Sequence, residues 1–182
     1  MTSKIIRTLG CLLLVFSSSA FAKEPVFQVE VQSKTPQVTI VPIARPDYYA
    51  FYNRRIKIVK LIADFTLTTR IKNISSQEQT LSLWSCAYGY HWVPDDYPVV
   101  YTGVEMCLDN MLEQVTRKPS EWIERDLLLG ITESAKPGKI TFRLGFRPIV
   151  NTGKKGEAKI RYGDVETWSN PVTVELQAGP QK

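Results

Sequence analysis

The residues best suited to catalysis cluster around the single histidine of this sequence, His91. Ser85 precedes it and the carboxylates Asp95 and Asp96 follow it, so a Ser/His/Asp grouping can be assembled from neighbours. A working triad also needs a strained nucleophile turn and an oxyanion hole, and no G-x-S-x-G motif surrounds Ser85. One histidine does not complete a zinc site either. The sequence therefore predicts a packed or exposed histidine, no catalytic residues and no enzyme.

Acidic side chains are densest in the same stretch, at Asp95, Asp96, Glu105 and Asp109. Carboxylate oxygens are calcium ligands, but the regular D-x-D-x-D-G spacing of a calcium loop is absent. Two carboxylates that face each other across a groove could also hydrolyse a glycoside, and the sequence does not fix their separation. Solvated acids in loops are far commoner than either kind of site. We therefore expect no metal and no cofactor.

Aromatic side chains are the more suggestive feature of this stretch. Six rings fall within eighteen residues: Trp84, Tyr88, Tyr90, Trp92, Tyr97 and Tyr101. Amphipathic rings at this density suit a recognition surface, because they bury area with little loss of rotamer entropy. The cores of β-sandwiches also use Trp and Tyr, so core packing and recognition both stay open. The candidate recognition residues are Tyr90, Trp92, Tyr97 and Tyr101, and a second cluster holds Tyr48, Tyr49, Phe51 and Tyr52.

The domain that must position these residues begins after an export signal, residues 1–22. Two basic residues precede an apolar run over residues 9–16, and an A-x-A cleavage site ends at Ala22. A lipidated Cys11 is the alternative, but the apolar run continues beyond that cysteine. We therefore expect cleavage after Ala22, a single domain over residues 23–182, and a periplasmic or secreted protein. No other apolar stretch approaches the ~20 residues of a membrane-spanning helix.

Cleavage would leave two of the three cysteines, Cys86 and Cys107. An even pair in an exported chain predicts a disulfide. Closing a loop of about 22 residues would stabilise the fold by ~3 kcal/mol in the chain-entropy model. A two-cysteine metal site is the alternative, but metal-binding cysteines usually come in short C-x-x-C steps. The bridge would pin the excursion formed by residues 85–111, the least regular stretch of the mature chain, to its neighbouring strand.

Composition and charge limit the classes of protein. The chain has 182 residues, of which 43% are hydrophobic and 23% are charged, which is typical of a globular domain. The predicted signal carries two of the 23 basic residues, so the mature balance of 21 basic and 18 acidic residues gives +3. A positive charge this small predicts no nucleic-acid partner.

Alternation of apolar and polar residues dominates the mature sequence. It runs through residues 27–32, 65–72, 140–146 and 172–176, which are rich in Val, Ile, Thr and aromatics. Turn residues bound these runs, as at Asn73-Ile74-Ser75-Ser76. No segment keeps a helical apolar stripe for three turns. About seven to nine short strands at regular spacing predict an all-β sandwich.

Several motifs also stand in a recognisable order. They are Trp84-Ser85-Cys86, His91-Trp92, Cys107 with Asn110, residues 142–148 (FRLGFRP) and residues 168–174 (WSNPVTV). This order, over roughly residues 60–176, resembles small exported bacterial proteins with an immunoglobulin-like sandwich and no settled function. The resemblance implies an immunoglobulin-like antiparallel β-sandwich with one disulfide-closed loop, and it implies no catalytic residues. One departure is Arg117-Lys118-Pro119-Ser120, which stands where relatives carry a Pro-Gly turn.

These observations together predict an exported, non-catalytic binding or structural module. We expect it to recognise a protein partner through the loop between Cys86 and Cys107, displayed on a rigid sandwich. A protease inhibitor that inserts the closed loop into an enzyme cleft is one alternative. A carbohydrate-binding module that uses exposed Trp and Tyr rings is another.

Overall fold

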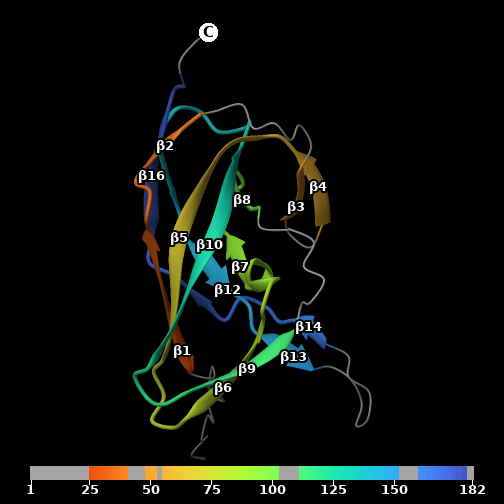
Figure 1. Ribbon diagram of the computed structural model, residues 1–182, viewed down its shortest axis with the longest axis vertical. Coiled ribbons are helices and arrows are strands. Elements are labelled where there is room, and N and C mark those ends of the chain that lie inside the picture. Colours follow the sequence, from red (N-terminus) through yellow and green to blue (C-terminus); the bar gives the residue numbers. More distant parts are fainter. Residues whose placement is uncertain (1–24, 41–47, 53–54, 103–110, 152–159, 180–182) are drawn as a thin grey trace, which may run out of the picture.

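The computed structural model of the chain describes residues 25–40, 48–52, 55–102, 111–151 and 160–179. Apart from one short 3-10 helix, η1 (Tyr88–His91), every described element is a β-strand (Figure 1). The prediction of an all-β chain is therefore confirmed. The described residues form sixteen strands, more than the seven to nine expected, because several runs are interrupted and small two-stranded pairs are added. No helix among the described residues is long and apolar enough to cross a membrane.

The largest sheet has four antiparallel strands. In spatial order they are β1 (Phe27–Ser33), β5 (Leu61–Asn73), β10 (Trp122–Thr132) and β8 (Val99–Tyr101). β5 and β10 pair over almost their whole length, from Trp122 opposite Lys72 to Thr132 opposite Leu61. In β1 and β5, where alternation was predicted, alternate side chains point into the core. Among the described strands only β5 pairs with β1, so β1 is an edge of this sheet.

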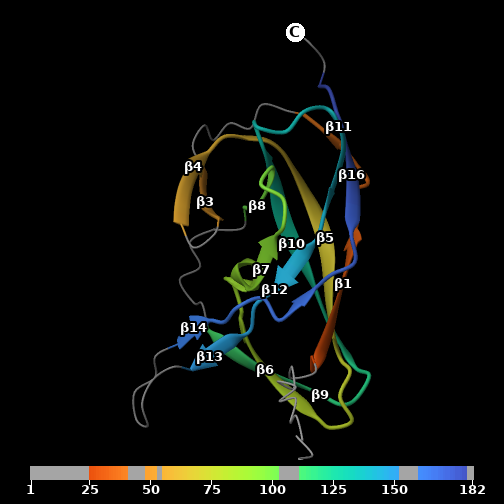
Figure 2. The ribbon, with the colours of Figure 1, turned by 180° about the vertical axis from the view of Figure 1, so that it is seen from behind.

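Two three-stranded sheets stand opposite the largest sheet (Figure 2). In one, β11 (Gly138–Phe142) pairs with β16 (Val172–Gln177), and β16 pairs in parallel with β2 (Gln37–Thr39). In the other, β12 (Leu144–Phe146) lies between β7 (Trp92–Pro94) and β15 (Thr167–Trp168). Only Arg143 separates β11 from β12, so the two sheets share one continuous central stretch of chain.

Three two-stranded pairs complete the described structure. They are β3 (Tyr48–Tyr52) with β4 (Arg55–Val59), β6 (Gln79–Trp84) with β9 (Leu112–Arg117), and β13 (Ile149–Asn151) with β14 (Ile160–Tyr162). The pairs β6–β9 and β13–β14 lie together at the lower end of the molecule (Figures 1 and 2). The second aromatic cluster, residues 48–52, forms β3, and its side chains lie outside the described residues.

The turn after β5 shows why the sequence folds this way locally. The Asn73 side chain accepts hydrogen bonds from the Ser75 backbone N–H and hydroxyl, and it donates to the carbonyls of Gln77 and Arg117. Asparagine favours such turns because its side chain mimics a backbone turn. The bond to Arg117 also ties the turn to the end of β9. The predicted strand end at Asn73 is therefore confirmed.

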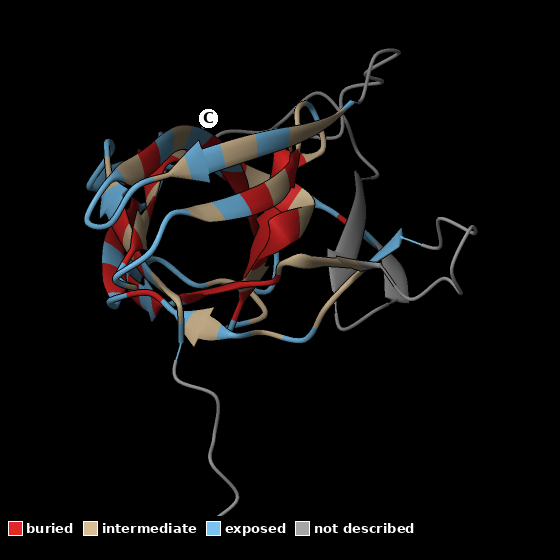
Figure 3. Cartoon of the chain, turned by 90° about the horizontal axis from the view of Figure 1, so that it is seen from below, coloured by how far each residue is buried: buried red, intermediate tan, exposed pale blue. Residues whose placement is uncertain are grey.

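One core fills the space between the facing sheets. Buried positions line the interior in the view from below (Figure 3), and the largest sheet and both three-stranded sheets contribute them. The rings of Phe65 on β5 and Phe142 on β11 meet edge to face, with centroids 5.9 Å apart. Each large apolar side chain buried in this way stabilises the fold by about 1.5–3 kcal/mol. Beside this core, a smaller cluster of Val59, Leu61 and Val100 lies under the end of β10.

Candidate functional site

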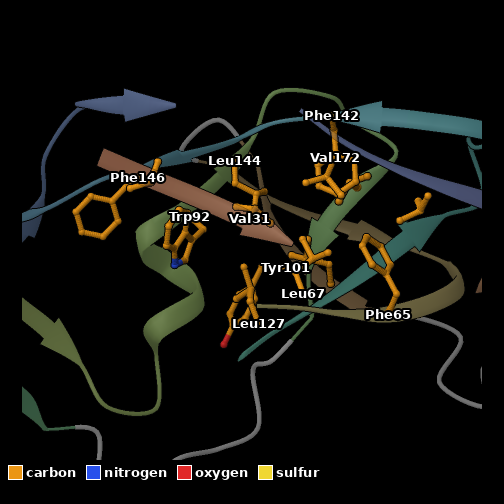
Figure 4. Close-up of a cluster of buried hydrophobic side chains, with 14 of the residues drawn as sticks. Val31, Phe65, Leu67, Trp92, Tyr101, Leu127, Phe142, Leu144, Phe146 and Val172 are labelled. Atoms are coloured by element: carbon orange, nitrogen blue, oxygen red, sulfur yellow. The ribbon is translucent and has the colours of Figure 1, made fainter. Parts of the chain in front are cut away.

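Three of the six rings of the aromatic cluster, those of Tyr88, Trp92 and Tyr101, belong to the core. Trp92 is only 3% exposed and Tyr101 only 9% exposed, so their expected placement on a recognition surface is wrong. Trp92 packs against Phe146, with ring centroids 5.3 Å apart, and its ring lies among buried side chains (Figure 4). The register of β7 explains this placement, because Trp92 stands opposite Phe146 and both side chains point into the core.

Tyr90 and Tyr97 keep partial exposure. The Tyr90 ring lies edge to face against Tyr101, at 5.4 Å, and also contacts Tyr162. Loss of solvation raises the pKa of Tyr90 and raises that of Tyr162 more strongly. Tyr90 therefore packs against the core through Tyr101 and Tyr162, and only part of its surface is left for a partner.

His91 is completely buried and has both ring nitrogens engaged. Its Nε2 accepts a hydrogen bond from the Trp84 backbone N–H at 3.1 Å, and its Nδ1 lies 2.9 Å from the Arg147 carbonyl. The ring also stacks on Phe146. Loss of solvation lowers the pKa of His91 to about 4, so the imidazole is neutral at pH 7. This histidine joins three segments of the fold, as expected of a packed side chain.

Ser85 and Asp95 also have structural partners. The Ser85 hydroxyl accepts a hydrogen bond from the Met111 N–H, which extends the β6–β9 pairing by one residue. The Asp95 carboxylate accepts hydrogen bonds from the backbone N–H and the Nε of Arg143, at 2.7 and 2.9 Å. These contacts assign both side chains to holding strands together.

The remaining predicted ligands divide between surface and undescribed positions. Asp96 is exposed, whereas Glu105 and Asp109 lie outside the described residues. Within the described part of the chain, no three His, Cys, Asp or Glu side chains gather as a metal site would require. Cys86 follows β6 at the surface and Cys107 lies outside the described residues, so their bridge stays a prediction.

An open groove of about 490 Å³ lies between the edge strand β1 and the short strand β15. Its volume falls in the range of about 300–1,000 Å³ that is usual for small-ligand sites. The groove is lined by successive residues of β1 and by two residues near β15: Gln28, Val29, Glu30, Val31, Gln32, Trp168 and Asn170. None of these residues was a predicted site residue.

Trp168 forms the aromatic wall of this groove and is 41% exposed. It pairs with Gly145 on β12, where an added Cβ would lie 3.0 Å from the indole ring and 2.7 Å from Val165. The missing side chain at Gly145 therefore lets the ring lie close to the strand. The Arg143 guanidinium sits 5.3 Å from the indole centroid, and Asp95 holds that guanidinium in place.

Asn170 links the two sides of the groove. Its side-chain oxygen accepts a hydrogen bond from the Val31 N–H at 2.9 Å, and its amide donates to the Val31 carbonyl at 3.0 Å. This side chain pairs with the free edge of β1 much as a neighbouring strand would. It thereby holds β1 beside the start of β16.

The exposed polar side chains of the groove come from one face of β1. Gln28 donates a hydrogen bond to Glu30, and Glu30 lies 3.7 Å from Arg70. The Gln32 side chain makes no hydrogen bond to any described residue. Its amide is therefore able to donate and accept hydrogen bonds with a ligand.

A sequence signal for the groove exists at Asn170-Pro171. Alternation from Val172 backwards would bury residues 170 and 168, yet both are exposed while Ser169 is buried. Proline lacks the N–H that a strand needs, so it marks an irregularity at which the inward and outward positions exchange. A break in register at Pro171 could thus have placed Trp168 at the surface.

Comparison with known proteins does not assign this site. The chain matches no protein-family model, and no curated protein is similar to it in sequence.

Proposed function

We propose that this protein is an exported, non-catalytic binding module that takes its ligand in the groove between β1 and β15. The observation that carries the proposal is the groove itself, with an exposed tryptophan and hydrogen-bonding side chains on a rigid framework. Binding sites typically combine apolar or aromatic walls with a few polar groups that orient the ligand. The buried, fully engaged His91 favours a binding role over catalysis.

The same proposal includes an immunoglobulin-like sandwich. The order β1-β5-β10-β8 corresponds to the A-B-E-D order of such a sheet, with strands lettered along the chain. The opposite layer, β7 beside β12 and β11 beside β16, corresponds to C-F-G. The pairs β3–β4, β6–β9 and β13–β14 would then be additions between lettered strands.

Export and the bridge between Cys86 and Cys107 also belong to the proposal. They rest on the signal-like residues 1–22 and on the even cysteine pair of the mature chain. Intact-mass measurement of the exported protein, with and without reductant and an alkylating agent, tests both. We expect residues 23–182 less two hydrogens, whereas two free thiols or an acyl chain on Cys11 would contradict the proposed compartment or anchor.

The groove is a better recognition site than a surface formed by Trp92 and Tyr101. Those two rings are buried, so a partner would have to open the core to reach them. Trp168 and Gln32 are exposed, and they stand on paired strands. Binding there would require no rearrangement of the fold.

Site-specific labelling tests the proposed function. A fluorescent amino acid at Lys34, an exposed position two residues beyond Gln32 and outside the lining, should report saturable binding when the exported protein is titrated with separated protein, glycan and small-molecule fractions of the cell envelope. The same label at Lys139, an exposed position on β11 outside the groove, is the matched control. If no fraction changes the Lys34 signal, or if both positions respond alike, the groove is not the binding site.

A further inference from the structure

Resting on the proposed function, we propose that the groove between β1 and β15 binds a neutral saccharide, with the pyranose ring packed on Trp168 and its hydroxyls bound by the amides of β1. Three features of the groove support this ligand class: an exposed indole, planar polar side chains in a row, and a described lining with no cation and a single carboxylate, Glu30, that lies 3.7 Å from Arg70.

Trp168 is suited to bind a sugar because neighbouring residues hold its ring in place. Arg143 lies 5.3 Å from the Trp168 ring centroid and is itself paired with Asp95, so the indole has a fixed support. Gly145 leaves room for the ring against β12. A ring fixed before binding loses little entropy when an apolar C–H face packs on it. An ordinary exposed tryptophan without such supports would lose more.

The polar side of the groove matches hydroxyl groups. A sugar hydroxyl both donates and accepts, and amides offer both functions in one plane. Gln28 and Gln32 are exposed and lie two positions on either side of Glu30, so all three side chains leave the same face of β1. The three side chains therefore form a row along the strand. An extended chain of sugar units fits such a row better than a single compact molecule.

Charge favours a neutral ligand over an anionic one. Glu30 is the single charged side chain among the lining residues that the structure describes, and Arg70 lies 3.7 Å from it. Arg70 also pairs with Glu124, at 3.2 Å. Arg143 behind the indole is neutralised by Asp95. A sulfated or uronic-acid polymer would therefore find no unpaired cation in the described groove.

The edge of β1 raises the possibility of an extended peptide that adds a strand there, as other sheet edges do. Asn170 already occupies the Val31 position of that edge, which interrupts the row of backbone groups a peptide strand would need. The saccharide is therefore the better occupant, and the peptide is an outcome that the experiment separates.

The test begins with the exported protein on an array of neutral glycans, anionic glycans and extended peptides. Neutral glycans that bind are then measured by titration calorimetry against four variants. We expect Trp168→Ala to weaken binding about tenfold or more, Trp168→Phe to retain part of the affinity, and Gln32→Ala to weaken binding a few-fold. Leu128→Ala, with a side chain 42% exposed on β10 and outside the groove, should bind as the unchanged protein does.

Each contrary result has a definite meaning. Binding of anionic glycans alone, of no glycan, or of a neutral glycan with unchanged affinity in Trp168→Ala would overturn the saccharide assignment. Binding of an extended peptide that is lost in Gln32→Ala would also overturn it while leaving the proposed binding function intact. Thermal unfolding of Trp168→Ala and Gln32→Ala checks that any loss of affinity does not come from loss of the fold.

Discussion

Two tryptophans flank the same short strand, and they have opposite environments. Trp92 on β7 stands opposite Phe146 of β12, whereas Trp168 on β15 stands opposite Gly145. Neighbouring residues of a strand point to opposite faces of the sheet. Trp92 therefore packs in the core, and Trp168 lies at the surface with Gly145 beneath it. The tryptophans opposite two adjacent residues of β12 therefore differ in role. Trp92, opposite Phe146, stabilises the core, and Trp168, opposite Gly145, is available to a ligand.

Among the substitutions that test this contrast, removal of the Trp92 ring should cause the largest loss of unfolding free energy. Trp92→Ala leaves a cavity beside Phe146, and truncations of this kind cost about 3–5 kcal/mol of unfolding free energy. Chemical denaturation followed by circular dichroism measures the loss. If the denaturation midpoint of Trp92→Ala equalled that of the unchanged protein, Trp92 could not be a core residue.

Acid should lower the stability of the fold through His91, which packs on Phe146 as Trp92 does. The pKa of His91 is lowered by burial to about 4 from an ordinary value of 6.5, so the unfolded chain binds the proton more readily between these values. The His91 contribution is present above pH 6.5 and is lost as the pH falls to 4, by about 3 kcal/mol. Denaturation at pH 7 and pH 4 measures this difference.

Carboxylates also titrate in this interval, so the decisive quantity is the difference between the protein and His91→Gln. Glutamine does not titrate, and the variant should show a pH dependence weaker by about 3 kcal/mol over the same range. Equal pH dependence in both proteins would mean that His91 is protonated as easily in the fold as in the unfolded chain.

Loss of the Asn170 side chain, which lines the same groove as Trp168, should cause an intermediate loss of unfolding free energy. Asn170→Ala removes both hydrogen bonds to the Val31 backbone, which should cost about 1–3 kcal/mol. Asn170→Asp is the matched variant, since it keeps the acceptor for the Val31 N–H and loses the donor to the carbonyl. Denaturation should rank Asn170→Asp between the unchanged protein and Asn170→Ala, and equal stability of all three would exclude a structural role for the amide.

Trp168→Ala should have the smallest effect on stability. Its side chain is 41% exposed, and exposed substitutions usually change the unfolding free energy by no more than about 0.5 kcal/mol. The same denaturation series measures it. A loss comparable with that of Trp92→Ala would place the indole in the core and remove the contrast between the two sides of β12.

The sequence predicted which residues form strands better than it predicted which of their side chains are exposed. Alternation identified β5 and β16, which keep one face in the core over their whole length, and β11, which does so from Ile140 onward. The same rule could not place Trp92, because β7 has only three residues and follows a 3-10 turn. Its burial is decided by pairing with Phe146, more than fifty residues later in the chain.

The groove was harder to predict because it depends on two distant segments. Gln28 and Gln32 belong to an ordinary alternating strand, and nothing in their spacing identifies a binding surface. The groove arises only when Asn170 is bonded to Val31, 139 positions earlier in the chain. The break in register at Pro171 was visible, but the strand that it would approach was not.

The bond between Asn170 and Val31 also bears on how the protein behaves when crowded with copies of itself. A sheet edge with unpaired N–H and C=O groups is a template for the edge of another molecule, and such pairing leads to aggregation. The Asn170 side chain occupies one of these positions in the middle of β1. A single amide thereby shortens the stretch of edge on which a second chain could begin to pair, and it protects the fold from its own copies without an additional strand.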